Sequence, residues 1–286
     1  MDGIVIVDKP AGWTSQDVTA KLRGVFRTRR IGHGGTLDPM ATGVLPVFVG
    51  RATRGVEFFE HAEKTYETVL RLGVATDTED ITGTVLKISP VNITKDKLED
   101  VLSQFRGEIR QIPPMYSALK INGQKLCDLA RKGKEVVRQS RPVTIHKLEL
   151  LEFTGDTAKL LVHCSKGTYI RTLCKDIGEA LGCGGCMQTL RRTSAGEYTI
   201  DEAISLQTLI NAEDSGQYLR GVDTLFLSCP AVTLTDKQEL RCRNGNSFSL
   251  AIEDGTYRAY SNTGEFLMLA KVEAGVMSTV KSFFSV

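Results

Sequence analysis

Hydrophobic residues near the start of the chain follow two different periods. Residues 3–9, GIVIVDK, form an apolar run that ends at two charged residues, and this pattern predicts a strand. Thr14 and Asp17 then have the spacing of a capping box, so a helix is expected to begin there. The apolar residues of this helix share one face because they recur at helical spacing: Val18, Leu22, Val25 and Phe26. A strand followed by an amphipathic helix is therefore expected at the start of the fold.

Further strands and a helix are predicted in the middle of the chain. Residues 64–76, KTYETVLRLGVAT, alternate between the two sides of a strand, and Tyr66 lies near its start. Thr94 predicts the N-cap of a helix whose apolar residues recur at helical spacing. Two long strands are expected near residues 143–153 and 158–164.

The segment KGTYIRTLCKDIGEALG, residues 166–182, has apolar residues at the spacing of one helix face. Arg171 lies at the start of this expected helix and points off the apolar face. Strands and helices interleave up to this point without a regular βαβ rhythm. We therefore predict an α+β fold rather than a doubly wound sheet.

The pattern changes near Ser228. Beyond it, short strand-like runs are separated by turn pairs such as Asn244-Gly245 and Asp254-Gly255, with one short helix expected after Asp236. These features predict a small β-barrel of about sixty residues, which is near the lower size for an independent domain. We therefore expect a main domain over residues 1–226 and a second domain over 227–286.

The composition is that of an ordinary globular protein, with 41% hydrophobic and 24% charged residues. The N-terminal sequence MDGIVIVDKP has no basic leader and no long apolar run, so we expect neither a signal peptide nor a membrane span. Seven cysteines, an odd number, are more typical of reduced thiols than of a disulfide framework. A cytoplasmic location is the expectation.

The net charge of +2 is too small to indicate the kind of partner, but the basic residues are clustered along the chain. Residues 120–141 hold seven lysines or arginines against two carboxylates. Smaller basic clusters comprise Arg27, Arg29 and Arg30, and Arg191 with Arg192. A solvated surface would explain any one of them. Together they favour a polyanionic partner, RNA or DNA.

One short segment has the features of a catalytic loop. In IGHGGTLDPMATGVLPV, residues 31–47, four glycines and two prolines surround a single carboxylate, Asp38. Pro39 disfavours the helical region for Asp38, and the glycines permit backbone paths closed to other residues. A plain turn explains these residues equally well. A buried carboxylate needs a cation to stay ionised, and Arg171 is the best candidate.

Five segments in this order resemble the motif series of the TruB family of tRNA pseudouridine synthases. The resemblance extends over nearly the whole chain, ends in a segment similar to a PUA domain, and rests on these motifs: KPAGWTS (9–15), GHGGTLDPMATGVLPV (32–47), KTYE (64–67), CSKGTYIRTL (164–173) and LRR (190–192). It implies a pseudouridine synthase fold, in which helices flank a central, mixed and mostly antiparallel sheet. It also implies that the basic stretch, within about residues 112–141, is an RNA-clamping insertion. Gly34 and Met40 depart from the threonine and leucine common in bacterial members.

The resemblance also implies roles for individual residues. Asp38 corresponds to the catalytic aspartate, Arg171 to its ion-pairing arginine and Tyr66 to the tyrosine that stacks on the base. Substrate-binding positions are assigned to His33, Tyr169, Leu190, Lys9, Lys64 and Lys132, and Lys9 with Pro10 matches a motif that buttresses the catalytic loop. Without the resemblance, Lys9 and Leu190 would be interpreted as a solvated cation and a core residue.

The implied reaction is isomerisation of the T-loop uridine at position 55 of tRNA to pseudouridine. Asp38 acts either as a nucleophile at C1′ or as a base that removes the C2′ proton. No cofactor is needed, and Cys183 with Cys186 lacks the second ligand pair of a structural zinc site. The expected partner is tRNA, without a guide RNA or a membrane, and the chain is expected to be a monomer. The alternatives are a nucleoside hydrolase, a non-catalytic RNA chaperone and a guide-dependent synthase.

Overall fold

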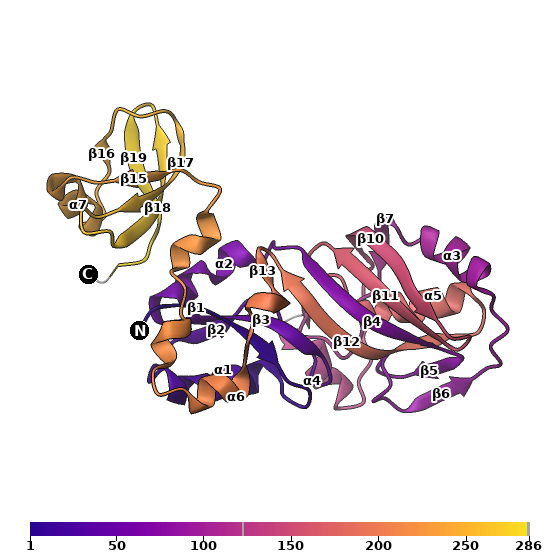
Figure 1. Cartoon of the computed structure of the whole chain (residues 1–286). Coiled ribbons are helices and arrows are strands. Elements are labelled where there is room, and N and C mark those ends of the chain that lie inside the picture. Colours follow the sequence, from indigo (N-terminus) through magenta and orange to yellow (C-terminus); the bar gives the residue numbers. More distant parts are fainter. Residues whose placement is uncertain (122, 285–286) are drawn as a thin grey trace.

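A large mixed sheet forms the centre of the first part of the chain in the computed structural model, which describes residues 1–121 and 123–284 (Figure 1). Its strands are β1 (Gly3–Lys9), β2 (Ile31–His33), β3 (Thr42–Val49), β4 (Lys64–Leu72), β7 (Gly107–Gln111), β10 (Arg141–Phe153), β11 (Thr157–Cys164), β12 (Gly185–Ala195), β13 (Tyr198–Thr199) and β14 (Ile204–Ser205). The main path is β14-β1-β3-β12-β4-β11-β10-β7, with β2 on β3 and β13 on β12. The β1–β14 and β3–β12 pairs are parallel and the other described pairs are antiparallel, so the predicted α+β class is confirmed.

Helices surround this sheet and bury their apolar faces in one core. They are α1 (Ser15–Val25), α3 (Lys95–Ser103), α5 (Ile170–Ala180) and α6 (Leu206–Asn211). Thr14 and Asp17 form the predicted capping box at the start of α1. Shorter helices and turns are α2 (Val56–Phe59), η1 (Gly50–Gly55), η2 (Ile200–Glu202), η3 (Ser215–Tyr218) and η4 (Val222–Phe226). Among the described residues, no helix has both the length and the apolar character needed to cross a membrane.

The strand predicted over residues 64–76 is two strands. The first, β4, alternates as expected and buries Tyr66, Thr68 and Leu70 on one side. Gly73 then adopts φ +78°, and its N–H donates to the carbonyl of Gly184 (3.0 Å), so the chain leaves the sheet. The following residues form a separate hairpin of β5 (Val74–Thr76) and β6 (Val85–Ile88).

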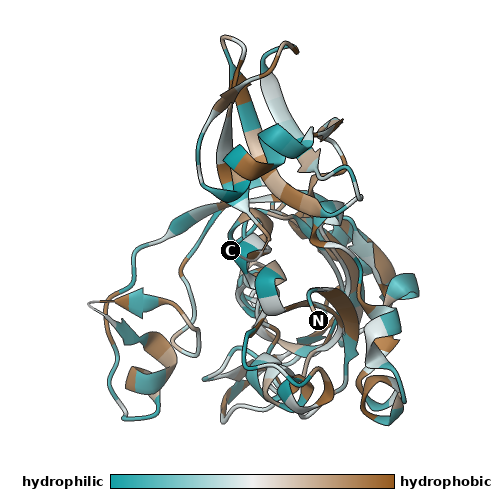
Figure 2. Cartoon of the chain, turned by 90° about the vertical axis from the view of Figure 1, so that its left-hand side faces the viewer, coloured by the Kyte–Doolittle hydropathy of each residue, from teal (hydrophilic) through white to brown (hydrophobic). Residues whose placement is uncertain are grey.

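The segment between β7 and β10 stands away from the body as a small lobe, which is visible at the left of Figure 2. It contains the hairpin β8 (Lys120–Ile121) and β9 (Gln124–Lys125), followed by α4 (Leu126–Ala130). Its side chains at residues 116–118, 127 and 131 face the cavity described below.

A second sheet occupies the C-terminal part and has its own hydrophobic core. Its order is β15 (Ala231–Thr233), β17 (Gly255–Tyr260), β18 (Phe266–Glu273), β19 (Val276–Ser282) and β16 (Phe248–Ser249), with α7 (Asp236–Arg243) after β15. The helix after Asp236 was expected, and the strand-like runs at residues 231–235, 247–252, 255–261 and 265–272 correspond to all of these strands except β19. That strand was missed because several of its residues are polar or exposed.

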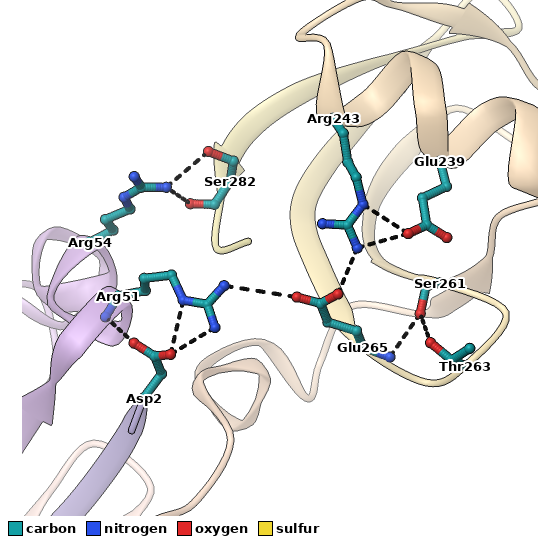
Figure 3. Close-up of polar contacts among 9 residues, drawn as sticks. All are labelled: Asp2, Arg51, Arg54, Glu239, Arg243, Ser261, Thr263, Glu265 and Ser282. Carbon is teal, nitrogen blue, oxygen red and sulfur yellow. Dashed lines mark hydrogen bonds and ion pairs between the residues drawn. The ribbon is translucent and has the colours of Figure 1, made fainter. Parts of the chain in front are cut away.

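The two sheets are joined by an apolar cluster and a chain of ion pairs. Phe226 of η4 packs against Phe58 of α2 and Phe283 near the C-terminus, with ring centroids 5.1 and 6.0 Å apart. Beside this cluster, Arg51 binds Asp2 (2.7 Å) and reaches Glu265 (3.8 Å), as Figure 3 shows. In the same figure, Glu265 binds Arg243 (2.6 Å) and Arg54 donates to the carbonyl of Ser282 (3.0 Å). These contacts hold the C-terminal sheet against the start of the chain and against the segment of η1 and α2.

Candidate active site

The loop that carries Asp38 connects β2 to β3 and is fixed at several points. Gly34 N–H donates to the carbonyl of Pro46 (2.8 Å), and Leu37 N–H donates to the hydroxyl of Ser15 at the start of α1 (2.8 Å). The Pro39 carbonyl accepts from the N–H of Gly12 (2.8 Å). The side chain of Leu37 is buried in the main core. The loop therefore presents Asp38 from a backbone that is held on both sides.

The side chain of Lys9 supports this loop through hydrogen bonds. Its ammonium group donates to the carbonyls of Pro10 (3.0 Å), Trp13 (2.6 Å) and Pro39 (3.3 Å). The side chain is fully buried, and this burial lowers the pKa of Lys9 to about 8. The ammonium group of Lys9 faces backbone carbonyls, and Lys9 is not among the residues that line the cavity, so this geometry favours the buttressing role over a substrate contact, which stays a prediction.

Replacement of Lys9 by methionine should lower kcat by about tenfold, since the loop that carries Asp38 loses a support and a small displacement of a reacting group is costly. Three carbonyls also lose their donor, so Tm should fall. Lys21→Met, on the exposed side of α1, is the matched control. Wild-type kcat and Tm in Lys9→Met would show that the loop does not depend on this side chain.

Arg171 forms a two-point ion pair with Asp38. The Nε–Oδ2 distance is 2.9 Å and the Nη2–Oδ1 distance is 3.3 Å. The remaining donors of Arg171 reach the carbonyls of Thr78 (3.1 Å) and Tyr116 (2.7 Å). Asp80 lies 3.9 Å from the same guanidinium. The pair predicted between residues 133 positions apart is thus present.

Asp38 experiences opposing electrostatic effects. Burial raises the pKa of Asp38 above its ordinary value, the guanidinium of Arg171 opposes this rise, and Asp80 adds to it. The side chain of Arg171 is 6% exposed, whereas that of Asp38 is 32% exposed. The arginine is therefore enclosed in protein, and the carboxylate keeps one open side from which a substrate can approach.

The open side of Asp38 faces a cavity of about 800 Å³. Four other residues predicted for the site line it: Tyr66 of β4, Lys64 at the start of β4, Tyr169 before α5 and Leu190 of β12. Burial raises the pKa of Tyr66, so its phenol is neutral at physiological pH. The wall combines a few charged side chains, among them Asp38 and Asp80, with aromatic rings and apolar surface, which is the composition of a small-molecule or nucleobase pocket.

Two predicted residues lie elsewhere. His33 belongs to β2 and does not appear among the residues that line the cavity, and burial lowers the pKa of its imidazole. Within the described residues, its Nδ1 has no hydrogen-bond partner. Lys132 lies just after α4 on the exposed surface of the lobe. Neither side chain touches the cavity wall in this structure.

Arg192 was interpreted from sequence as part of a basic surface cluster, and this is wrong. It is 1% exposed and lies under the cavity, where it donates to the carbonyls of Val44 (2.6 Å) and Gly35 (3.1 Å). Arg191 is paired with Asp8 (2.9 Å). The positive charge at the base of the site was missed because only the tertiary structure brings Arg192 to these carbonyls and to the hydroxyl of Tyr66. The other small cluster, Arg27, Arg29 and Arg30, is exposed as expected.

Gly34 is required by the packing of Phe59. A Cβ at position 34 would lie 2.4 Å from Cδ1 of Phe59 and 3.1 Å from Phe48. Phe59 is confined by the rings of Phe48 and Tyr198, at 5.9 and 5.7 Å. The threonine that the family resemblance leads one to expect at this position therefore does not fit beside Phe59 in this chain.

We expect Gly34→Ala to lower the free energy of unfolding by about 1–3 kcal/mol in urea denaturation, because the ring of Phe59 has no space to withdraw. Adding Phe59→Leu to Gly34→Ala should recover part of the loss. Gly24→Ala, where a Cβ meets nothing within 4 Å, is the control and should be neutral or stabilising. Equal stability of Gly34→Ala and wild type would contradict this packing argument.

Comparison with known families identifies the chain. A model of the "TruB family pseudouridylate synthase (N terminal domain)" matches residues 23–170, just over half of the sequence. The chain belongs to the TruB family. A second model, "tRNA pseudouridylate synthase B C-terminal domain", matches residues 171–222. The resemblance inferred from the motifs is thereby confirmed.

Individual TruB relatives match most of the chain. tRNA pseudouridine synthase B of Stutzerimonas stutzeri is 43% identical over 280 residues, which cover 95% of this chain and 92% of the relative. The protein of the same name from Clostridium kluyveri is 41% identical over 290 residues, or 99% and 100% of the two chains. The Dechloromonas aromatica protein is 46% identical over 252 residues, or 87% and 84%.

Two solved structures share the fold of this chain. The "Crystal Structure of a Cbf5-Nop10-Gar1 Complex" has a TM-score of 0.74 at 26% identity and covers 99% of this chain and 85% of that one. The "Structure of H/ACA RNP bound to a substrate RNA containing 2'-deoxyuridine" has a TM-score of 0.73 at 24% identity, with the same coverage. The pseudouridine synthase fold is confirmed, and the C-terminal sheet of β15 to β19 is PUA-like.

All seven cysteines carry free thiols. Among the described residues, no group of three histidine, cysteine or acidic side chains is arranged to hold a metal ion. Cys183 and Cys186 are both buried at the end of α5 and the start of β12.

Proposed function

We propose that this TruB protein converts the T-loop uridine at position 55 of tRNA to pseudouridine in the cytoplasm, acting as a monomer and without a guide RNA or a cofactor. The observation that carries the proposal is the Asp38–Arg171 pair, whose carboxylate faces an 800 Å³ cavity. The relatives that match across most of the chain are named for tRNA pseudouridine synthesis.

The substrate uridine has to leave the RNA stack before a carboxylate can reach its sugar. Extruding a base costs a few kcal/mol, and the cost is least where the RNA is already a loop. Tyr66 on the cavity wall offers an aromatic surface for the uracil, and Tyr169 and Leu190 enclose it. We propose that His33, which lies beside the catalytic loop, braces the space in the RNA that the base vacates.

Asp38 then acts on the ribose by one of two routes. As a nucleophile it forms an O–C1′ bond while the N1–C1′ bond breaks and uracil takes the electron pair. As a base it removes the C2′ proton while the same bond breaks, giving a glycal, and it later returns that proton. In both routes the uracil then rotates and C5 bonds to C1′. In the first route this step breaks the bond between Asp38 and C1′ and frees the carboxylate, and in both routes the C5 proton is then lost. Tyr66 is the proposed acceptor of that proton: its neutral phenol takes the C5 proton at oxygen while its own hydroxyl proton passes to water.

The remaining surface is proposed to hold the RNA backbone. The lobe within residues 112–141 carries Arg131 at the cavity and Lys132 on its exposed side, so it can clamp phosphates next to the flipped nucleotide. Lys64 lines the cavity, and burial lowers its pKa to about 8. We propose residues 1–226 as the catalytic domain and 227–286 as an RNA-binding domain that acts through shape, because its charges balance.

The test is to incubate the purified chain with an unmodified tRNA transcript and to map pseudouridine at nucleotide resolution. We expect a single product at position 55 without any added RNA or metal. A transcript with cytidine at that position is the control and should yield none. Conversion that requires a guide RNA would support the guide-dependent alternative, whereas release of free uracil would support a hydrolase.

A further inference from the structure

The loop between β5 and β6, residues 77–84, supplies two of the groups that surround Arg171. The Thr78 carbonyl accepts from Arg171 (3.1 Å), and the Asp80 carboxylate lies 3.9 Å from it. Asp80 is itself oriented by the side chain of Thr78 (2.9 Å) and by the N–H of Thr82 (2.9 Å). The position of this loop therefore decides where the guanidinium lies, and Arg171 in turn orients Asp38.

Glu79, between these two residues, points away from the cavity. Its backbone has φ +64°, a conformation that residues with a Cβ seldom adopt. Its carboxylate is 11% exposed, accepts a hydrogen bond from the hydroxyl of Thr172 (2.6 Å) and pairs with Lys175 (3.3 Å). Both partners belong to α5, the helix that carries Arg171. The backbone of Glu79 is strained while its carboxylate has two specific partners. We infer that these contacts hold the residue in this conformation.

Consecutive residues of the loop therefore contact consecutive residues of α5. Arg171 binds the loop at Thr78 and Asp80, and the next helix residue, Thr172, binds the loop residue that lies between them. The Glu79 carbonyl also accepts from the N–H of Met187 on β12 (3.0 Å), so the turn is attached to the central sheet. A shift of Glu79 would move both groups that face Arg171.

We propose that Glu79 is a positioning residue for the reaction. By joining the 77–84 loop to Thr172 and Lys175, its carboxylate sets the plane of the Arg171 guanidinium and, through it, the direction of Asp38. Glu79 does not line the cavity and so acts without touching the substrate. The proposal depends on the isomerase activity proposed above, and it adds a residue to the group that makes this activity efficient.

The test compares single-site variants in the tRNA assay. Glu79→Ala should lower kcat by about 10- to 100-fold and leave KM within about twofold, because Asp38 is misdirected while the RNA surface is intact. Glu79→Gln keeps an acceptor for Thr172 and should lose less. Glu79→Gly relieves the backbone strain but lacks the carboxylate, so it should be as slow as Glu79→Ala.

The partner residue and a matched control complete the design. Thr172→Val should resemble Glu79→Ala, and Thr172→Ser, which keeps the hydroxyl, should restore kcat. Glu179→Ala is the control, since Glu179 also contacts Lys175 (3.9 Å) but is exposed and does not contact the loop. Its kcat should equal that of wild type.

Wild-type kcat in Glu79→Ala, or equal losses in Glu79→Ala and Glu179→Ala, would overturn the proposal while wild-type conversion of tRNA still supports the function. If Glu79→Ala does not fold, the comparison of Thr172→Val with Thr172→Ser decides. Equal kcat in those two variants would also reject the role of Glu79. Absence of conversion by the wild-type chain would instead reject the proposed function itself.

Discussion

Asp38→Asn should form pseudouridine at least about 10³-fold more slowly than wild type under single-turnover conditions, because both available routes require a negatively charged oxygen at the ribose. The amide keeps the size of the carboxylate, so the cavity and the RNA surface are preserved. The dissociation constant for tRNA should stay within about threefold of the wild-type value. The measurements are nucleotide-resolution pseudouridine yield over time and filter binding of labelled tRNA.

A matched control separates this chemical effect from a general loss of negative charge. Asp77→Asn changes an exposed carboxylate in the 77–84 loop that accepts from the N–H of Thr84 (2.7 Å) and does not line the cavity. Its rate should be close to that of wild type. Conversion by Asp38→Asn within tenfold of the wild-type rate would show that Asp38 is only a turn residue. The RNA-chaperone interpretation would then be favoured.

The second large effect is expected for Arg171→Lys. Lysine keeps the charge but cannot make the two-point contact with Asp38 and also reach the carbonyls of Thr78 and Tyr116. We expect kcat to fall by about 100-fold, since Asp38 loses its fixed orientation. Tm should also fall, because buried carbonyls lose a donor.

Arg171→Lys should also change the pH dependence of the rate. Burial raises the pKa of Asp38 and Arg171 opposes that rise, so a weaker cation contact leaves the pKa higher. Because the reacting form is the carboxylate, the acid limb of the pH–rate profile should move to higher pH. Arg191→Lys, at a pair with Asp8 outside the cavity, is the control. An unchanged acid limb in Arg171→Lys would contradict the electrostatic role of this arginine.

Much of the fold could be predicted from local pattern. The strand over residues 3–9, the capping box of α1 and the alternation of β4 appear as expected, because each is specified by residues close together in sequence. The central strand β12 was missed. Its polar residues and the register shift between Met187 and Thr189 hide the alternation, and its burial comes from β3 and β4 on either side.

The part of the site that depends on the chemical type of the side chains could be predicted from the sequence. Asp38 and Arg171 could be paired because a buried carboxylate requires a cation and one arginine begins an otherwise apolar helix. The buried roles of Lys9 and Arg192 were not predictable, since only the tertiary structure brings together their partners, which are backbone carbonyls and, for Arg192, also the Tyr66 hydroxyl. Glu79 carried no signal in the sequence, because its left-handed backbone conformation occurs at a residue other than glycine.

The central claim, that Asp38 acts on the sugar of an extruded uridine, is tested most directly by a crystal structure of the Asp38→Asn variant bound to a T stem-loop RNA. The account predicts that the target uridine lies in the cavity, with its uracil against Tyr66 and C1′ or C2′ within about 3.5 Å of the residue 38 side chain. A complex in which that uridine stays stacked in the RNA, or in which residue 38 faces the phosphate backbone, would contradict it.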